Sequence, residues 1–573
     1  MSIINRTTVI HRLYISRTVS LPLSSPITDR FLSHRLIPKP VSPPPSSHHP
    51  IHKAFKFHRS SSYSSSPDYP TGDFDFVPHT GFKKILVKLK TLTALPSERI
   101  PSGSVLQIDL KGQISEQHGE VLSLPRICDN LLKAAYDPRI SAVCLHIYRL
   151  NCGWAKLDEI RREIMNFRKS GKLIVAYVPE IGGKQYYIAC ACDEIYTSPK
   201  AAPVSLFKGG VNSVIPEVEA LGSYKRLVGG EQIKDHSEMM TDLQDNIYSN
   251  WLDKVSSSTG KKREDIENFI NGDDVYQVHK LKEEGFVSNL LCDDEVITSL
   301  IEKLGVKSLC MVNFRKYSRV REWTVGISRG EEVIAIIRVS GTIDRKIIAQ
   351  EFINKIREVS ESKNLKAVIV RIDSSGGDIE YSDSMWKKIR SLADKIPIIA
   401  SMSDRAMGAG YYVAMGAGVI VAENLTLTGS IGVDSGNFRL ENMYNLIEWE
   451  EFTGWGTKKY HAANTEAFYE RARHMYIRFR DKAALSRSMT IDKMEEVAQG
   501  RIWTGKDAAS HGLVDAIGGL SRAIAIAKLK ANIPQNRHVT LVEHSIPSPN
   551  LLEVSTGIDY PLYDGRVLAV GPF

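Results

Sequence analysis

The chain repeats itself at a fixed interval of 225 residues, and this repeat limits its fold more than any other feature. An apolar run at 141–147 recurs at 366–372, and a Tyr-Tyr-Ile-Ala sequence at 186–189 recurs as Tyr-Tyr-Val-Ala at 411–414. A constant offset across separate segments is the signature of an internal duplication. The chain is therefore predicted to contain two copies of one folding unit.

Each copy alternates short apolar runs with segments of helical periodicity. The runs are rich in Val and Ile and almost free of polar residues, as at 173–178 and 398–402. Such runs are typical of parallel strands that are covered on both faces of a sheet. The prediction is an α/β fold with two largely parallel sheets and right-handed connections. Further helical segments are expected at about 235–305 and 465–531.

The net charge of +8 comes entirely from the first 66 residues, which hold nine Lys and Arg residues and one acid, Asp29. The remainder of the chain is neutral overall. A neutral body has no general surface for phosphate groups, so nucleic acid is not an expected partner.

The same segment, residues 1–66, is rich in Ser and Pro and lacks a long apolar core. This composition predicts an organelle transit peptide, with a merely disordered tail as the alternative. No stretch of 18 or more apolar residues occurs in the chain, so no membrane-spanning helix is predicted. Peripheral contact with a membrane stays open.

Seven cysteines lie between Cys128 and Cys310. Their number is odd and their spacing does not suggest a disulfide framework. Cys190 and Cys192 are close together, but no second Cys or His pair follows at the spacing of a zinc site. Buried free thiols are expected, and no metal site.

Three glycine-containing segments of the second copy are candidates for chemistry: 371–378, 404–412 and 425–433. The paired glycines Gly376 and Gly377 follow a predicted strand, and such a loop can form an oxyanion hole. The second segment has the pattern of a helix start, where a nucleophile would benefit from the helix field. Taken singly, each segment also fits a simple tight turn or a close packing contact.

Together, in this order, the sequences Ile-Asp-Ser-x-Gly-Gly, Ala-x-x-x-Gly-Tyr-Tyr and Leu-Thr-Gly-Ser-Ile-Gly-Val resemble the signature of the signal peptide peptidase A (protease IV) family. The chain is also similar to plant chloroplast members of that family at 245–253, 260–265, 481–488 and 500–507. The resemblance covers about residues 75–545. It implies a tandem duplication of crotonase-like (ClpP/crotonase-type) α/β units with additional helical segments.

On this basis the chain divides into four parts. They are a chloroplast transit peptide (1–66), an N-terminal protease IV domain (75–315) with the helical insertion, a C-terminal protease IV domain (330–545) and an irregular tail (546–573).

The resemblance also implies a site. The family cleaves peptide bonds with a serine–lysine dyad, and Lys225 in the sequence Gly-Ser-Tyr-Lys-Arg takes the position of the general base. Gly408 falls on the position of the nucleophilic serine, and Gly376 and Gly377 on the oxyanion loop. Glycine has no side-chain atom that can attack a carbonyl. The nearby serines Ser374, Ser375 and Ser403 are not expected to take over without rearrangement.

Two functions follow from the resemblance. One is a chloroplast serine endopeptidase that degrades membrane-associated proteins or signal peptides. The other is a catalytically inactive homologue that binds peptides or serves as an assembly subunit. An acyl-thioester enzyme is a third class, because the crotonase-like fold also hosts that chemistry, but the protease IV motifs are more specific than fold alone.

The resemblance implies peptide or unfolded protein substrates, a homo-oligomer (a tetramer) and thylakoid membrane association. It implies no metal or organic cofactor.

Overall fold

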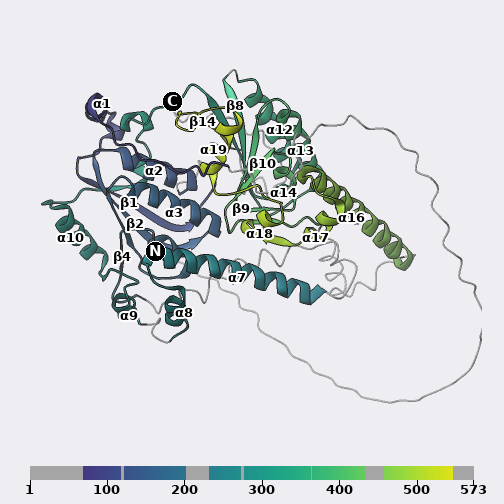
Figure 1. Cartoon of the computed structure of the whole chain (residues 1–573), viewed down its shortest axis with the longest axis horizontal. Helices are drawn as coiled ribbons and strands as arrows, with labels where there is room; N and C mark the ends of the chain where they lie inside the picture. The colour runs from purple at the N-terminus through teal and green to yellow at the C-terminus, as the bar shows by residue number, and fades with distance from the viewer. Residues whose placement is uncertain are drawn as a thin grey trace, which may run out of the picture. The chain divides into compact units, whose positions relative to one another are not determined.

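The first half of the chain forms a six-stranded parallel sheet with the strand order β5-β4-β3-β2-β1-β6 (Figure 1). The computed structural model describes residues 69–117, 122–201, 232–272, 277–362, 364–433 and 457–545. The strands are β1 (Ser104–Gln113), β2 (Ile140–Asn151), β3 (Leu173–Tyr177), β4 (Glu194–Thr197), β5 (Asn289–Leu290) and β6 (Met311–Asn313).

Both faces of this sheet are covered. In β2, Val143 and Leu145 belong to the larger core, while Ala142 and Cys144 belong to a separate cluster on the other face. Successive side chains of a strand point to opposite faces, so an uninterrupted apolar run requires two apolar environments. The helices of this half are α2 (Leu124–Tyr136), α3 (Trp154–Arg168), α4 (Gly183–Ala189), α7 (Gln232–Thr259), α8 (Arg263–Asn271), α9 (Val278–Glu283) and α10 (Asp293–Leu304).

The second half forms another sheet, with the order β12-β11-β9-β8-β7-β14 and with β10 between β9 and β13. Its strands are β7 (Val333–Ser340), β8 (Leu365–Ser374), β9 (Ile398–Met407), β10 (Val419–Ala422), β11 (Leu427–Gly429), β12 (Ile502–Thr504), β13 (Ala516–Ile517) and β14 (Thr540–Ser545). Its helices are α12 (Lys346–Ser360), α13 (Ile379–Ala393), α14 (Ala409–Ala414), α16 (Thr457–Arg487), α17 (Ile491–Val497), α18 (Gly505–Ser510) and α19 (Leu520–Lys530).

The two halves repeat the same elements in the same order. The bounds of α3 and α13, and those of β4 and β10, differ by 225 residues at both ends. The fold is therefore a duplicated α/β unit with two largely parallel sheets, as the sequence predicts. Among the described residues, the antiparallel pair of β11 and β12 occurs only in the second half.

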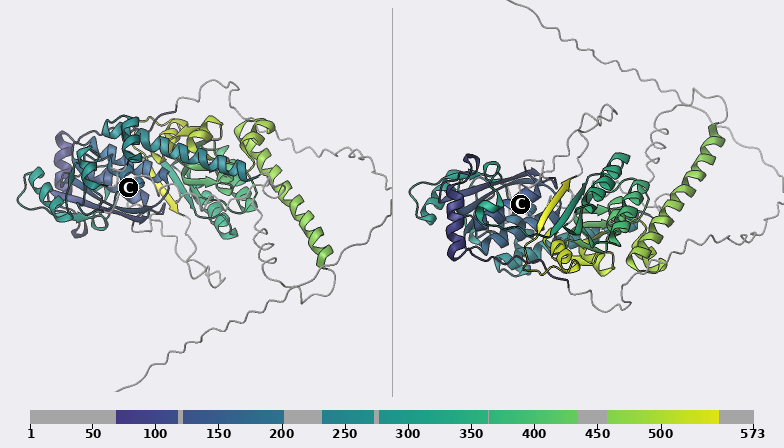
Figure 2. Two further views of the ribbon diagram at one scale, coloured as in Figure 1. Left: turned by 90° about the horizontal axis from the view of Figure 1, so that it is seen from below. Right: turned by 90° about the horizontal axis from the view of Figure 1, so that it is seen from above.

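Helix α7 connects the halves (Figure 2). Trp251 and Leu252 belong to the core of the first half, whereas Met239 and Leu243 pack against Met407 of β9 together with Leu427 and Ile502. All described residues belong to one compact unit, Ser64–Phe573.

A short N-terminal helix, α1 (Gly81–Leu92), precedes the first sheet. Three short elements complete the description: η1 (Pro96–Glu98), α11 (Phe314–Tyr317) and η3 (Glu322–Val325). No helix in the described ranges is long and apolar enough to cross a membrane. All seven cysteines are free thiols, and Cys144, Cys190 and Cys192 are buried.

One sequence prediction is wrong in detail. Residues 404–407 do not begin a helix but continue β9 as far as Met407, and α14 begins only at Ala409. The run pairs with β11 on one side and with the end of β8 on the other, and these ladders extend the strand. The predicted transit peptide and C-terminal tail lie outside the described residues.

Candidate active site

The three glycine motifs meet at the carboxyl ends of neighbouring parallel strands. β8 ends at Ser374 and β9 at Met407, and each strand is followed by a tight turn into a helix. In open α/β sheets, ligands bind beyond the carboxyl ends of the strands. A Cβ atom placed on Gly408 would lie 3.8 Å from the Cα of Gly376 and 3.7 Å from the carbonyl oxygen of Ser430. Residues from all three motifs therefore line one place.

Gly408 forms the turn between β9 and α14. Its φ is 50° and its ψ is −112°, a backbone conformation that residues other than glycine rarely adopt. Its N–H donates to the carbonyl of Gly429 at 3.0 Å, and its carbonyl accepts from Tyr412 N at 2.9 Å. The turn is thus fixed by backbone hydrogen bonds on both sides.

The loop after β8 is held by the loop after β7. Ile343 N donates to the carbonyl of Gly376 at 2.9 Å, and Asp378 N donates to the carbonyl of Ile343 at 2.8 Å. Gly376 and Gly377 have φ values of 144° and 146°. A Cβ on Gly377 would overlap the backbone of Ile343, whereas one on Gly376 would meet no atom within 4 Å. This loop is pinned in one conformation with its glycines at the site.

Two of the serines near Gly408 are engaged elsewhere. Ser403 lies inside β9, where its hydroxyl donates to the buried carboxylate of Glu116. The Ser374 hydroxyl donates to the carbonyl of Gly376 at 3.2 Å. Neither serine offers a free hydroxyl at the turn that Gly408 occupies.

The predicted general base, Lys225, lies outside the described residues, so its distance from Gly408 is not defined and its role stays a prediction. No group of three or more His, Cys, Asp or Glu side chains in the described ranges is placed to hold a metal ion.

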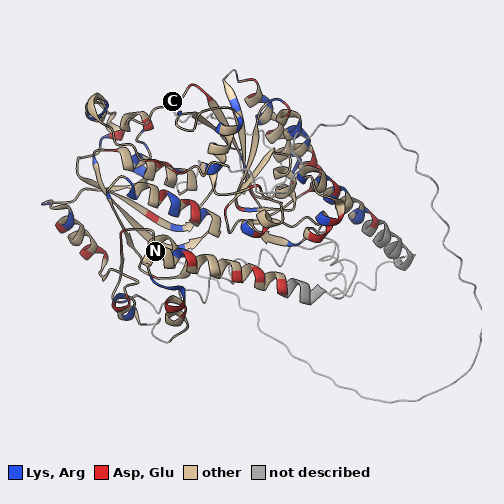
Figure 3. Cartoon of the chain, viewed as in Figure 1, with Lys and Arg blue, Asp and Glu red and all other residues tan. Residues whose placement is uncertain are grey.

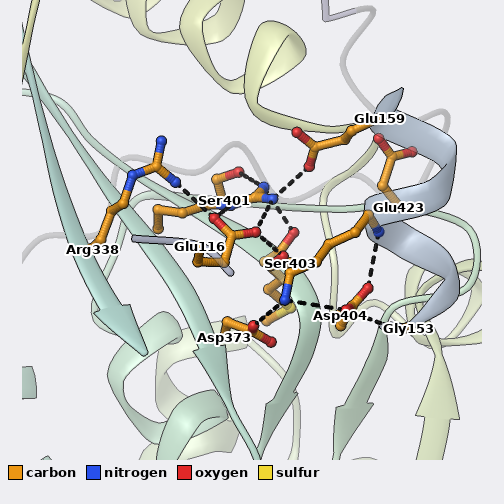
Figure 4. A network of polar contacts seen from close by, with 12 residues as sticks. Glu116, Gly153, Glu159, Arg338, Asp373, Ser401, Ser403, Asp404 and Glu423 are labelled. Carbon is orange, nitrogen blue, oxygen red and sulfur yellow. Dashed lines mark hydrogen bonds and ion pairs between the residues drawn. The ribbon is translucent and has the colours of Figure 1, made fainter. Parts of the chain in front are cut away.

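Beneath the site, a lysine of the first half joins two strands of the second (Figure 4). The Nζ atom of Lys156, on α3, lies 2.7 Å from Asp373 Oδ2 and 3.3 Å from Asp404 Oδ2. Asp373 is the penultimate residue of β8, and Asp404 lies four residues before Gly408 on β9. Burial alone would lower the pKa of Lys156, but the charges of Asp404 and Asp373 raise it well above its usual value.

Asp404 also completes the start of α3. Its carboxylate accepts from the backbone N–H groups of Gly153 at 2.7 Å and Lys156 at 2.9 Å. These groups have no acceptor within the helix, so an aspartate is a favourable cap. Glycine at position 153 leaves room for this carboxylate, because a Cβ there would overlap the Asp404 side chain.

A second buried cluster lies next to these residues and also joins the halves. The Arg371 guanidinium, on β8, is 2.9 Å from Glu116 and 2.6 Å from Glu159. Arg338, on β7, is 2.7 Å from Glu116. Burial by itself would raise the pKa of Glu116, but the neighbouring arginines and Lys156 hold it well below its usual value.

One feature of the sequence indicated these buried charged clusters. Arg338, Arg371, Asp373 and Asp404 stand in otherwise apolar strands, and charged residues are almost never fully buried without a partner. Their partners could not be identified, because Lys156 and Asp373 are 217 positions apart.

A surface cavity of about 430 Å³ lies between α7 and the β12–α18 segment. Its lining includes Asp242, Arg501, Trp503 and His511. Arg501 donates to Asp242 at 2.7 Å, and the guanidinium lies 4.5 Å from the centre of the Trp503 ring. This cavity is adjacent to the apolar cluster that contains Met407.

Two largely parallel sheets built from one repeated unit, with the glycine loop and the turn at the strand ends of the second copy, define a tandem α/β protein. Residues 166–307 and 390–534 match the sequence profile described as peptidase family S49. The chain is 50% identical over 534 residues to "Serine protease SPPA, chloroplastic" of Arabidopsis thaliana, an alignment that covers 86% of this chain and 78% of that protein. This protein belongs to peptidase family S49.

More distant similarity extends to bacteria. The chain is 26% identical over 536 residues to "Protease 4" of Haemophilus influenzae, covering 80% of this chain and 84% of that protein. A solved structure, that of a ClpP1 point mutant from Listeria monocytogenes, aligns with 33% of this chain and 94% of its own, at 12% identity and a TM-score of 0.24.

Proposed function

We propose that this chain is a chloroplast member of the family that keeps the peptide-binding framework but does not hydrolyse peptide bonds at the usual rate. The observation that carries the proposal is Gly408, which stands at the turn between β9 and α14 without a side chain. Loss of a covalent nucleophile removes roughly 10⁴- to 10⁶-fold of the rate in serine proteases, and binding and oxyanion donors provide the remainder.

The framework supports peptide binding without catalysis. The Gly376–Gly377 loop is pinned by Ile343, and the strand ends are joined by Lys156, so neither feature depends on a serine at position 408. Both features lie at the carboxyl ends of the strands, which is where ligands bind in open α/β sheets.

The alternative is an active serine endopeptidase, favoured by the names of the relatives, "Serine protease SPPA, chloroplastic" and "Protease 4". In that case the hydroxyl of another residue has to attack the substrate, because Gly408 has none, with Lys225 as the general base.

Casein hydrolysis discriminates the two functions. We expect the unmodified protein to release no acid-soluble peptide from fluorescein-labelled casein, and Gly408→Ser to release it. The built Cβ at this position meets only ordinary van der Waals contacts, so a serine side chain has room. The positive φ costs about 1–3 kcal/mol of stability, so folding of the variant is checked by circular dichroism.

Lys225→Ala is the control for the mechanism. Introduced into Gly408→Ser, it should abolish the restored hydrolysis. Hydrolysis by the unmodified chain that disappears in Lys225→Ala would refute the inactive assignment. Fluorescence anisotropy with the same casein measures binding separately, and its absence in the unmodified chain would refute peptide binding.

Assembly and location belong to the same proposal. We place the protein in the chloroplast, at the thylakoid membrane, as a homo-oligomer with four subunits. The chloroplastic relative supports the organelle. Fractionation of isolated chloroplasts and light scattering of the purified protein test these statements.

A further inference from the structure

Helix α1 exposes an apolar face that nothing in the described structure covers. Phe82 is 79% exposed, Ile85 65%, Leu89 57% and Leu92 77%. Large apolar side chains scattered singly on a surface need no explanation, but a contiguous set on one helix does. Val77 and Leu95, just outside the helix, add to the exposed apolar surface at 68% and 52%.

The helix is attached to the protein by its opposite side. At about 100° per residue, the exposed apolar residues from Leu92 to Leu86 fall within an arc of about 120°, and Val87 lies on the other side. Val87 is buried, and a Cβ on Gly326 would overlap it. The Lys90 ammonium lies 5.4 Å from the centre of the Trp323 ring on η3. This attachment directs the apolar face outward.

The charge on α1 has one sign. Its sequence contains four lysines and no acidic residue (Figure 3). Lys84 and Lys88 follow one border of the apolar arc, and Lys83 and Lys90 follow the other. Among the described residues, no acidic side chain forms an ion pair with Lys83, Lys84 or Lys88.

We infer that α1 lies in the surface of an anionic lipid bilayer, with Phe82, Ile85, Leu89 and Leu92 among the acyl chains and with Lys83, Lys84 and Lys88 at the headgroups. An apolar face bordered by lysines is the pattern of helices that bind in the plane of a membrane interface. Each lysine near an anionic surface strengthens binding, and the long lysine stems reach from the apolar border to the headgroups. The inference rests on the membrane association proposed above and names the element responsible.

A second copy of the chain is a less suitable occupant. In a two-fold symmetric contact the same helix would face itself, and the lysines of both copies would be brought together. An anionic bilayer satisfies the apolar face and the lysines at once, so charge complementarity favours the lipid.

Flotation with lipid vesicles tests the inference with the full chain. The probes are vesicles of phosphatidylcholine alone and of phosphatidylcholine mixed with phosphatidylglycerol. We expect binding to the mixed vesicles, and Phe82→Glu combined with Leu89→Glu should reduce the partition coefficient by at least about 10-fold. The matched control is Leu485→Glu combined with Leu529→Glu, two exposed leucines on other helices, which should leave binding unchanged.

Charge reversal separates the electrostatic component of vesicle binding from the apolar component. Lys84→Glu combined with Lys88→Glu should weaken binding to the mixed vesicles by about 10-fold or more and change binding to phosphatidylcholine alone much less. Lys307→Glu combined with Lys395→Glu is the control. The basic N-terminal segment is present in every variant, so differences in vesicle binding between variants come from the substituted residues.

Three outcomes are informative. Equal vesicle binding by the α1 variants and the unmodified protein would overturn the inference. Unchanged vesicle binding together with a loss of oligomers would assign α1 to a contact between copies, and would also overturn it. Binding that depends on α1 in a protein that fractionates away from thylakoids would refute the proposed location and leave the inference standing.

Discussion

Gly376 and Gly377 have nearly the same backbone conformation but different surroundings. Both φ values lie near 145°, a region that is essentially restricted to glycine. Only Gly377 faces another chain segment, because the backbone of Ile343 fills the space where its Cβ would stand. The two positions therefore separate conformational strain from steric overlap within one loop.

We expect Gly376→Ala to lower the free energy of unfolding by about 1–3 kcal/mol, the cost of the conformation alone. Gly377→Ala should cost more, because the loop also has to leave Ile343. Urea denaturation followed by circular dichroism measures both values. Equal losses in the two variants would show that the Ile343 contact does not hold the loop.

Helix α3 is the element through which the first half supports the site. Asp404 caps it, Lys156 and Glu159 reach strands of the second half, and Glu163 lies further along the same helix. Burial raises the pKa of the Glu163 carboxyl to about 7, above its usual 4.5. The folded protein therefore holds this proton more tightly than the unfolded chain does.

This carboxyl makes stability depend on pH. Its contribution is fully present below about pH 4.5 and is lost as the pH rises through about 7, because the folded state then has to bury a charge. Glu163→Gln should raise the free energy of unfolding at pH 8 by about 1–3 kcal/mol and leave it little changed at pH 4.5. Urea titrations at both pH values measure the difference.

The control for that experiment is Glu302→Gln, at an exposed position on α10, which should alter neither value. An equal gain at both pH values would contradict the assignment of the proton to Glu163.

The predictability of these elements follows from the range of the interactions that form them. β8 could be predicted because its apolar pattern is local. The extension of β9 to Met407 could not, since it depends on pairing with β11 and β8. Gly408 and the glycine loop were found through sequence motifs, whereas Lys156 and Glu116 were missed because their partners are more than 200 positions away. The role of Lys225 as general base stays a prediction.

At the scale of the whole molecule, buried charges join the two halves. Arg371 of the second half contacts Glu116 and Glu159 of the first, and all three side chains are buried. Removing one partner of a buried ion pair typically costs about 3–5 kcal/mol, because the other charge stays buried without compensation. The halves should therefore unfold together.

We expect Arg371→Ala to lower the free energy of unfolding by about 3–5 kcal/mol and to let the two halves unfold separately. Hydrogen exchange measured by mass spectrometry should give equal opening free energies for β2 and β8 in the unmodified protein, and different ones in the variant. Arg487→Ala is the matched control, since its buried partner Asp515 belongs to the same half. If Arg487→Ala separated the halves as well, the network would not be what couples them.

The backbone at position 408 has one more consequence. A serine there has to adopt a φ that favours glycine. A serine nucleophile at this turn therefore lowers the free energy of unfolding, and other interactions in the molecule have to offset that cost. Glycine at this position avoids that cost and changes no contact with a neighbouring residue. If the site does not cleave peptides, as proposed, glycine is the more stable residue at this turn.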